Sequence, residues 1–183
     1  MKQRLLFLGP PGAGKGTQAE RLASRHDLLH LSTGDLLRAE VRAGTPLGQE
    51  AEAVMARGEL VSDALVLAIV RERLLQHHGG WLLDGFPRNL EQAEALDQLL
   101  AELEQGIEAA VLLELDEGLL VQRMLGRGRA DDDEAVIRNR LEVYHSLTAP
   151  LVAHYAKRGL LCRVDAAGEI EAITQRIEAA LLD

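Results

Sequence analysis

The chain is poor in cysteine and carries no excess of positive charge, and each absence excludes a class of protein. Its 183 residues include one cysteine, Cys162, so neither a disulfide framework nor a four-cysteine structural zinc site is possible. Cys162 follows two leucines and is interpreted as a small core residue in a reducing compartment. The formal net charge of −9 argues against non-specific binding to nucleic acid or acidic membranes. Any anionic ligand must therefore be attracted by local arginines.

Long apolar runs are also missing. The run at residues 5–8 is too short for a signal peptide and far too short to span a bilayer, so we expect a cytoplasmic protein without a membrane partner. The six histidines lack the paired spacing of a metal site. The length suits one domain, residues 1–183, with a sizeable core.

The most informative stretch begins close to the N-terminus. Residues 5–8 predict a buried strand that stops at Gly9, and a helical pattern begins after Lys15. A strand, a glycine-rich loop and a helix in this order, with Gly9, Gly14 and Lys15 at this spacing, are typical of the P-loop. Its backbone N–H groups surround phosphate oxygens, and its lysine reaches the terminal phosphates. The stretch therefore predicts a nucleotide site.

The P-loop departs from the generic pattern at one position. Gly16 follows the lysine, and the hydroxyl arrives one place later as Thr17. The alternative interpretation is an ordinary glycine-rich turn. It is disfavoured because strand, loop and helix all fall where phosphate binding needs them.

Further strands alternate with helices along the chain. They are predicted at residues 28–31, 81–84, 110–115 and 160–164. Three helices without a strand between them occupy the stretch from residue 33 to residue 79 and are interpreted as an inserted helical flap. Five strands alternating with helices imply an α/β fold of the P-loop NTPase type, a five-stranded parallel sheet flanked by helices.

A long helix is predicted to begin near Glu134. It carries Ile137, Leu141 and Tyr144 on one face, which we interpret as its buried stripe. Pro150 is expected to kink or end this helix, because proline lacks the N–H that the helix interior needs.

Asp84 and Arg88 flank a stiff turn after the third strand. Asp84 ends that strand, and open α/β sheets bind ligands at the carboxyl ends of their strands. It is therefore a candidate for the magnesium shell, the alternative being a strand-end aspartate that caps the next turn. Arg88 offers a bidentate guanidinium to a second phosphate group.

More arginines are predicted near the same edge of the sheet. They fall in loops or helices that face the carboxyl ends of the strands, and in so acidic a chain they suggest phosphate binding: Arg38, Arg123, Arg127, Arg129 and Arg140. The alternative is a set of solvated helix faces, which we prefer for Arg138 because it points away from Arg140.

The motifs contain no evident general base. An alcohol or water as acceptor would call for one, whereas a nucleoside monophosphate brings its own ionised oxygen. Such an acceptor needs only charge neutralisation, alignment and exclusion of water.

Four motifs in order resemble the adenylate kinase family, in its short-lid type. They are Gly9-Pro-Pro-Gly-Ala-Gly-Lys-Gly-Thr17-Gln18, His30-Leu-Ser-Thr-Gly-Asp35-Leu-Leu-Arg38, Asp84-Gly-Phe-Pro-Arg88-Asn-Leu-Glu-Gln92 and Gly128-Arg129-Ala-Asp131-Asp132. The resemblance implies reversible transfer of the terminal phosphate of ATP to AMP with Mg²⁺, in adenine nucleotide homeostasis and purine salvage. It also implies a monomer, a monophosphate-binding flap at residues 32–61 and a very short lid at about residues 125–132.

The resemblance also implies a role for each matching residue. Those on the ATP side are Gly12, Ala13, Gly14, Lys15, Gly16, Thr17, Arg123, Arg127 and Gly168. Those on the AMP side are Thr33, Arg38, Glu59, Leu60, Val61, Gly85, Phe86, Pro87, Arg88, Gln92, Arg129 and Arg140. Those implied in the phosphate transfer itself are Lys15, Asp84, Arg88, Arg123, Arg127, Arg129 and Arg140, with Mg²⁺ held through Thr17 and Asp84.

Several alternatives remain open at this point. Which of Arg123 and Arg127 makes the main ATP contact is undecided, because Gly128 alone separates Arg127 from Arg129. Gln92 fits either a reader of adenine or, with Asn89, a helix capping box. A UMP/CMP kinase is the nearest rival function, and a P-loop module without turnover is a more distant one.

Overall fold

A five-stranded parallel sheet forms the centre of the computed structural model, which describes residues 1–59, 61–126 and 133–182. Its strands lie in the order β2-β3-β1-β4-β5. Their bounds are β1 (Arg4–Leu8), β2 (Leu29–Ser32), β3 (Trp81–Asp84), β4 (Ala109–Glu114) and β5 (Leu161–Asp165). This architecture confirms the predicted α/β fold, and each strand lies within one residue of its predicted start.

Eight helices in the described residues connect and cover these strands. They are α1 (Lys15–His26), α2 (Thr33–Ala43), α3 (Pro46–Ala56), α4 (Asp63–Leu75), α5 (Leu90–Glu102), α6 (Glu117–Gly126), α7 (Glu134–Lys157) and α8 (Ile170–Leu181). None of them combines the length and the apolar composition needed to cross a bilayer.

Helices cover both faces of the sheet, and alternate residues of a strand point to opposite faces. Leu5 and Phe7 of β1 pack in a cluster with apolar residues of α1, α6 and α8. Leu6 and Leu8 pack in a second cluster with apolar residues of α4 and α5. The near-continuous apolar runs of the strands reflect this double burial.

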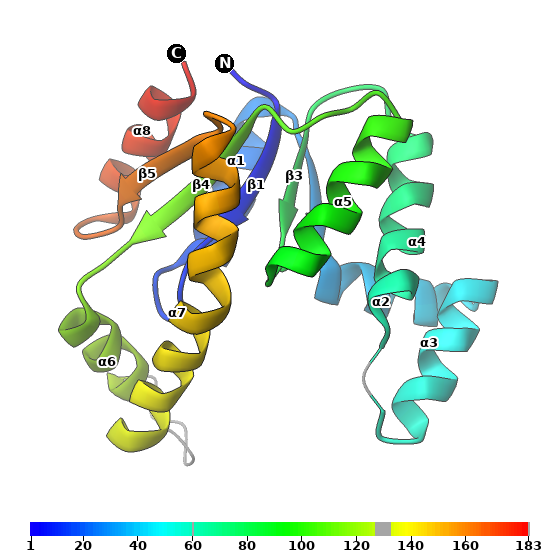
Figure 1. Ribbon diagram of the computed structural model, residues 1–183, viewed down its shortest axis with the longest axis horizontal. Helices are drawn as coiled ribbons and strands as arrows, with labels where there is room; N and C mark the ends of the chain where they lie inside the picture. The colour runs from blue at the N-terminus through cyan, green and yellow to red at the C-terminus, as the bar shows by residue number, and fades with distance from the viewer. Residues whose placement is uncertain (60, 127–132, 183) are drawn as a thin grey trace.

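Two helical arms extend beyond the carboxyl edge of the sheet (Figure 1). One contains α3 and lies on the side of β3, and the other contains α6 and the first turns of α7. The first arm follows β2 without an intervening strand, as predicted for the inserted helices. The P-loop, residues 9–17, and the turn after Asp84 leave the sheet at this same edge, because all five strands are parallel.

Pro150 is predicted to kink or end the long helix, and the prediction that the helix ends there is wrong. Helix α7 runs through Pro150 and continues to Lys157. Beyond the proline, Leu151 and Tyr155 are fully buried in the cluster on the α4 and α5 face. Burial of these two side chains extends the helix past a residue that weakens it locally.

Candidate active site

The P-loop connects β1 to α1 in a conformation that depends on glycine. Gly12 and Gly14 have φ values of 87° and 83°, in the left-handed region that glycine adopts without strain. Gly14 is the N-cap of α1 and has no side chain to accept the first N–H groups of the helix. These N–H groups and the helix dipole together favour a phosphate at this point.

Lys15 and Asp84 form an ion pair between the P-loop and the end of β3. Lys15 Nζ lies 3.1 Å from Asp84 Oδ1, and His30 Nε2 lies 3.6 Å from Asp84 Oδ2. Burial raises the pKa of the Asp84 carboxyl, but the nearby imidazole of His30 and the ammonium of Lys15 outweigh it and leave that pKa below its ordinary value. Asp84 is therefore ionised at neutral pH.

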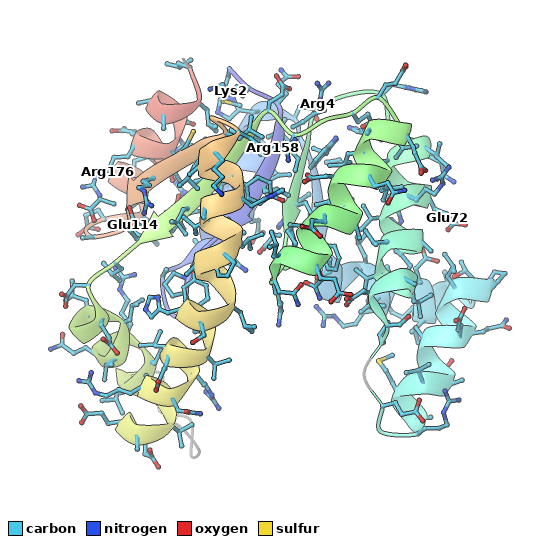
Figure 2. All side chains as sticks on the ribbon, in the orientation of Figure 1. Lys2, Arg4, Glu72, Glu114, Arg158 and Arg176 are labelled. Atoms are coloured by element: carbon cyan, nitrogen blue, oxygen red, sulfur yellow. The ribbon has the colours of Figure 1, made fainter. Side chains whose placement is uncertain are left out.

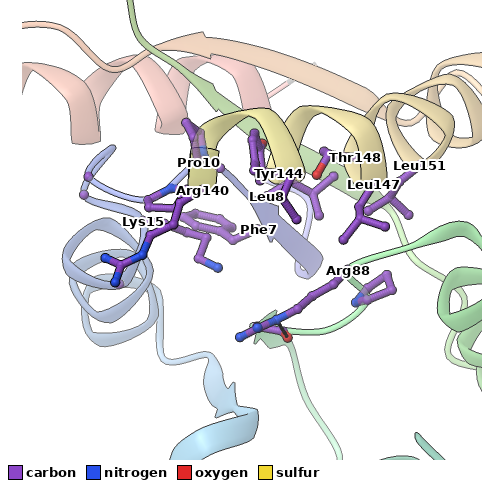
Figure 3. A pocket seen from close by; sticks show the side chains of 18 of the residues that line it. Phe7, Leu8, Pro10, Lys15, Arg88, Arg140, Tyr144, Leu147, Thr148 and Leu151 are labelled. Atoms are coloured by element: carbon purple, nitrogen blue, oxygen red, sulfur yellow. Dashed lines mark hydrogen bonds between the residues drawn. The ribbon is translucent and has the colours of Figure 1, made fainter. Parts of the chain in front are cut away.

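A cavity of about 760 Å³ opens beside this pair. The P-loop forms one wall, and the turn at Gly85, Pro87 and Arg88 forms another. Lys15 and Arg140 enter it from the P-loop and α7, and Arg88 extends toward them from the opposite side (Figure 3). With Arg123, which also lines it, four positive side chains thus meet in one cavity.

The turn that carries Arg88 is held close to the start of α2. Gly85 has a φ of 95°, and a Cβ placed there would lie 2.7 Å from Thr33 Oγ1. A residue other than glycine would therefore push this turn and the first residue of α2 apart. Arg88 Nε donates to Gly85 O at 3.0 Å, which orients the guanidinium.

Arg123 connects the P-loop to the segment after β5. Its Nη1 donates to Gly12 O at 3.2 Å and its Nη2 to Ala166 O at 3.4 Å. Gly168, two residues beyond Ala166, has a φ of 105°. Arg123 therefore holds the P-loop, the end of α6 and the loop before α8 in one arrangement.

Several other charged side chains lie on the outside of the molecule. Glu72, Glu114 and Arg176 project from different elements, and Lys2 and Arg4 lie at the edge of the sheet opposite the two arms (Figure 2).

The family assignment rests on comparisons with known proteins. The family described as "Adenylate kinase" matches residues 7–160. A protein named adenylate kinase from Synechococcus sp. (strain RCC307) is 71% identical over 181 residues, which cover 99% of this chain and 100% of the relative. Relatives of the same name from Synechococcus sp. (strain WH7803) and Prochlorococcus marinus (strain MIT 9303) are 71% and 68% identical, each with 99% of this chain and 100% of its own covered. The chain belongs to the adenylate kinase family.

The cavity is lined by only some of the residues to which the adenylate kinase resemblance gives a role. Those present are Gly12, Gly14, Lys15, Gly16, Thr17, Gly85, Pro87, Arg88, Arg123 and Arg140. Asp84 reaches this group through its ion pair with Lys15. Phe86 is buried in the core, and it shares a cis peptide bond with Pro87.

The remaining expected residues lie elsewhere. Thr33, Arg38, Glu59, Val61, Gln92, Ala13 and Gly168 do not line the cavity. Arg38 is ion-paired with Asp35 on the exposed surface of α2. Leu60, Arg127, Arg129 and most of the expected lid fall outside the described residues.

One wall of the cavity was missed from the sequence. It is formed by the residues of α7 that follow Arg140 at helical spacing: Val143, Tyr144, Leu147, Thr148 and Leu151. Ile137 and Leu141 are fully buried as predicted, but Tyr144 is only half-buried and faces the cavity instead of completing the stripe. Burial raises the pKa of Tyr144 to about 12, so it enters the cavity as a neutral phenol. This wall could have been predicted from the sequence, because these residues follow Arg140 at the i+3 and i+4 spacing of one helix face.

Proposed function

We propose that this protein catalyses the reversible transfer of the terminal phosphate of ATP to AMP, which yields two molecules of ADP. The observation that carries the proposal is the convergence of Lys15, Arg88 and Arg140 on one cavity from three parts of the chain. The P-loop suits the triphosphate, and the guanidinium on the opposite side suits a second phosphate group. The names of the relatives at 68–71% identity support the same reaction.

In this reaction, an ionised phosphate oxygen of AMP attacks the terminal phosphorus of ATP. The bond from that phosphorus to its bridging oxygen breaks, and ADP leaves. Lys15 and the P-loop N–H groups stabilise charge on the transferred group, while Arg88 and Arg140 hold the two phosphates in line. No side chain needs to remove a proton, because the AMP phosphate already carries negative charge at neutral pH.

We also propose that Mg²⁺ is held through Thr17 and Asp84. The ionised Asp84 carboxylate and the Thr17 hydroxyl are the oxygen donors that Mg²⁺ prefers, and Thr17 lines the cavity. Groups of three or more histidine, cysteine or acidic side chains able to hold a metal are absent from the described residues. This fits an ion that takes most of its ligands from water and substrate phosphates. Mg²⁺ bound there would neutralise charge on the phosphate oxygens.

The segments that would close over the substrates are further proposals. We assign the AMP-binding flap to residues 32–61, because α2 and α3 form an arm next to the turn that carries Arg88. We assign the lid to about residues 125–132, most of which fall outside the described residues. We further propose a cytoplasmic protein that acts as a monomer, and a cavity built from a single chain is consistent with the monomer.

The test is to incubate the protein with ATP, Mg²⁺ and each nucleoside monophosphate in turn and to quantify the diphosphates. We expect ADP to form fastest with AMP. Faster formation of UDP or CDP would instead support the UMP/CMP kinase alternative. Nucleotide binding without any diphosphate would contradict the assignment as an enzyme.

A further inference from the structure

The side-chain amide of Gln92 is held at both of its ends. Its Oε1 accepts from the backbone N–H of Arg88 at 2.7 Å, and its Nε2 donates to Asp63 Oδ1 at 2.9 Å. Asp63 is the first residue of α4, whereas Gln92 lies in the first turn of α5. The backbone of Gln92 is fixed as well, because its N–H donates to Asn89 Oδ1 at 2.9 Å.

These two partners determine which way the amide faces. A backbone N–H can only donate, and a carboxylate can only accept. If the amide turned over, its NH₂ group would face the N–H of Arg88 and its oxygen would face the carboxylate of Asp63. Both hydrogen bonds would be lost, and each would be replaced by a repulsive contact.

The amide keeps one N–H and one oxygen lone pair for a ligand. A purine with a 6-amino group presents a ring acceptor beside an exocyclic donor, whereas a 6-oxo purine presents a ring N–H beside a carbonyl acceptor. An amide that is free to turn can satisfy either pattern. An amide of fixed orientation satisfies only one of them.

We propose that Asp63 is a specificity-determining positioning residue, which locks the orientation of the Gln92 amide so that the monophosphate site accepts a 6-amino purine and rejects a 6-oxo purine. This inference rests on the proposed function and on the role of Gln92 as a reader of adenine, which the adenylate kinase resemblance implies. Asp63 acts through Gln92 and needs no contact of its own with the nucleotide.

The experiment compares AMP with IMP, which has a carbonyl in place of the 6-amino group, as phosphate acceptors with ATP and Mg²⁺. In the Asp63→Asn variant, the new amide can donate or accept, so only the backbone N–H of Arg88 still opposes a turn of the Gln92 amide. We expect the AMP-to-IMP ratio of kcat/KM to fall by about tenfold, mainly through KM for the monophosphates, with KM for ATP unchanged. Glu91→Gln is the matched control, since it removes an exposed acid from a first helical turn beside Gln92, and it should leave the ratio unchanged.

A double-mutant cycle separates this role from a general structural one. Gln92→Ala alone should lower the ratio, and adding Asp63→Asn to it should change the ratio no further. An unchanged ratio in Asp63→Asn, or an equal fall with and without Gln92, would overturn the inference. Neither result would touch the proposed function, which fails only if the unmodified protein makes no ADP from AMP.

Discussion

The P-loop side and the flap side of the cavity are held by different kinds of contact. On the P-loop side, the contacts join segments far apart in the chain. Arg123 donates to the P-loop at Gly12 O, and Gln18 of α1 accepts from Thr174 Oγ1 of α8 at 2.7 Å. Gln18 is 98% buried, so this contact belongs to the core.

On the flap side, most side-chain contacts are local. They join residues two to five positions apart, as in Arg38 with Asp35, Arg57 with Glu59 and Gln49 with Gly44. Glu40 is different, because this buried carboxylate accepts from Arg73 Nη2 of α4 at 3.1 Å.

Local contacts stabilise individual helices, whereas long-range contacts fix helices relative to the sheet. The P-loop side is thus fixed by contacts within the chain itself. The flap side is joined to α4 by the Glu40–Arg73 pair, in addition to the apolar packing of Leu36 and Ala51. Four substitutions test this contrast between the two sides.

The largest effect is expected from Lys15→Met on the P-loop side. It should lower kcat by about 10³-fold, because it removes the charge that faces the transferred phosphate. The protein should stay folded, since Lys15 lies in the loop and Asp84 keeps His30 nearby. Diphosphate formation and circular dichroism measure the two quantities.

Lys157→Met is the control for Lys15→Met, because Lys157 is exposed at the end of α7. It should retain full activity. Loss of folding in Lys15→Met would contradict the assignment of Lys15 to the site rather than to the core.

Arg123→Lys should raise KM for ATP by about tenfold and leave KM for AMP nearly unchanged. The single ammonium cannot bridge Gly12 O and Ala166 O in the fork geometry of a guanidinium. Initial rates with each substrate varied in turn measure both constants. Arg163→Lys is the control, because Arg163 is exposed and pairs with Glu114. If Arg123→Lys changed KM for ATP and KM for AMP equally, the P-loop side and the flap side would not act separately.

On the flap side, Arg73→Met should lower the free energy of unfolding by about 2 kcal/mol, because Glu40 remains buried without its cation. The value is below that of a fully buried pair, since the Arg73 side chain is 36% exposed. KM for AMP should rise while KM for ATP stays constant. Urea unfolding and initial rates provide the measurements.

Arg71→Met is the matched control for Arg73→Met. Arg71 lies on the same helix and pairs with Glu102, but both side chains are about half exposed. Its loss should cost less than about 1 kcal/mol. If Arg71→Met destabilised the protein as much as Arg73→Met, burial of Glu40 would not be the cause.

The smallest effect is expected from Asn89→Ala, which removes the N-cap of α5. Stability should fall by about 1 kcal/mol in urea unfolding, because the N–H of Gln92 loses its acceptor. The preference for AMP over IMP should persist, since Asp63 and Arg88 still orient the Gln92 amide. A lost preference would mean that the cap, and not Asp63, sets the orientation.

Much of this protein was determined by short stretches of its sequence. The P-loop, the five strands and the inserted helices were predicted correctly, because each depends on local hydrophobic pattern, glycine and capping residues. The capping role of Asn89 was likewise visible in the sequence and is confirmed, and Arg138 is exposed as predicted, with Glu134 and Glu117 as partners.

Other features were decided only by tertiary structure. The passage of α7 through Pro150 depends on burial of Leu151 and Tyr155 against the sheet, which outweighs the local cost of the proline. The hydrogen bond between Gln92 and Asp63 joins residues on two different helices, so no spacing in the sequence predicts it. Local propensity describes single elements, whereas the orientation of an amide or the wall of a cavity depends on which elements pack together.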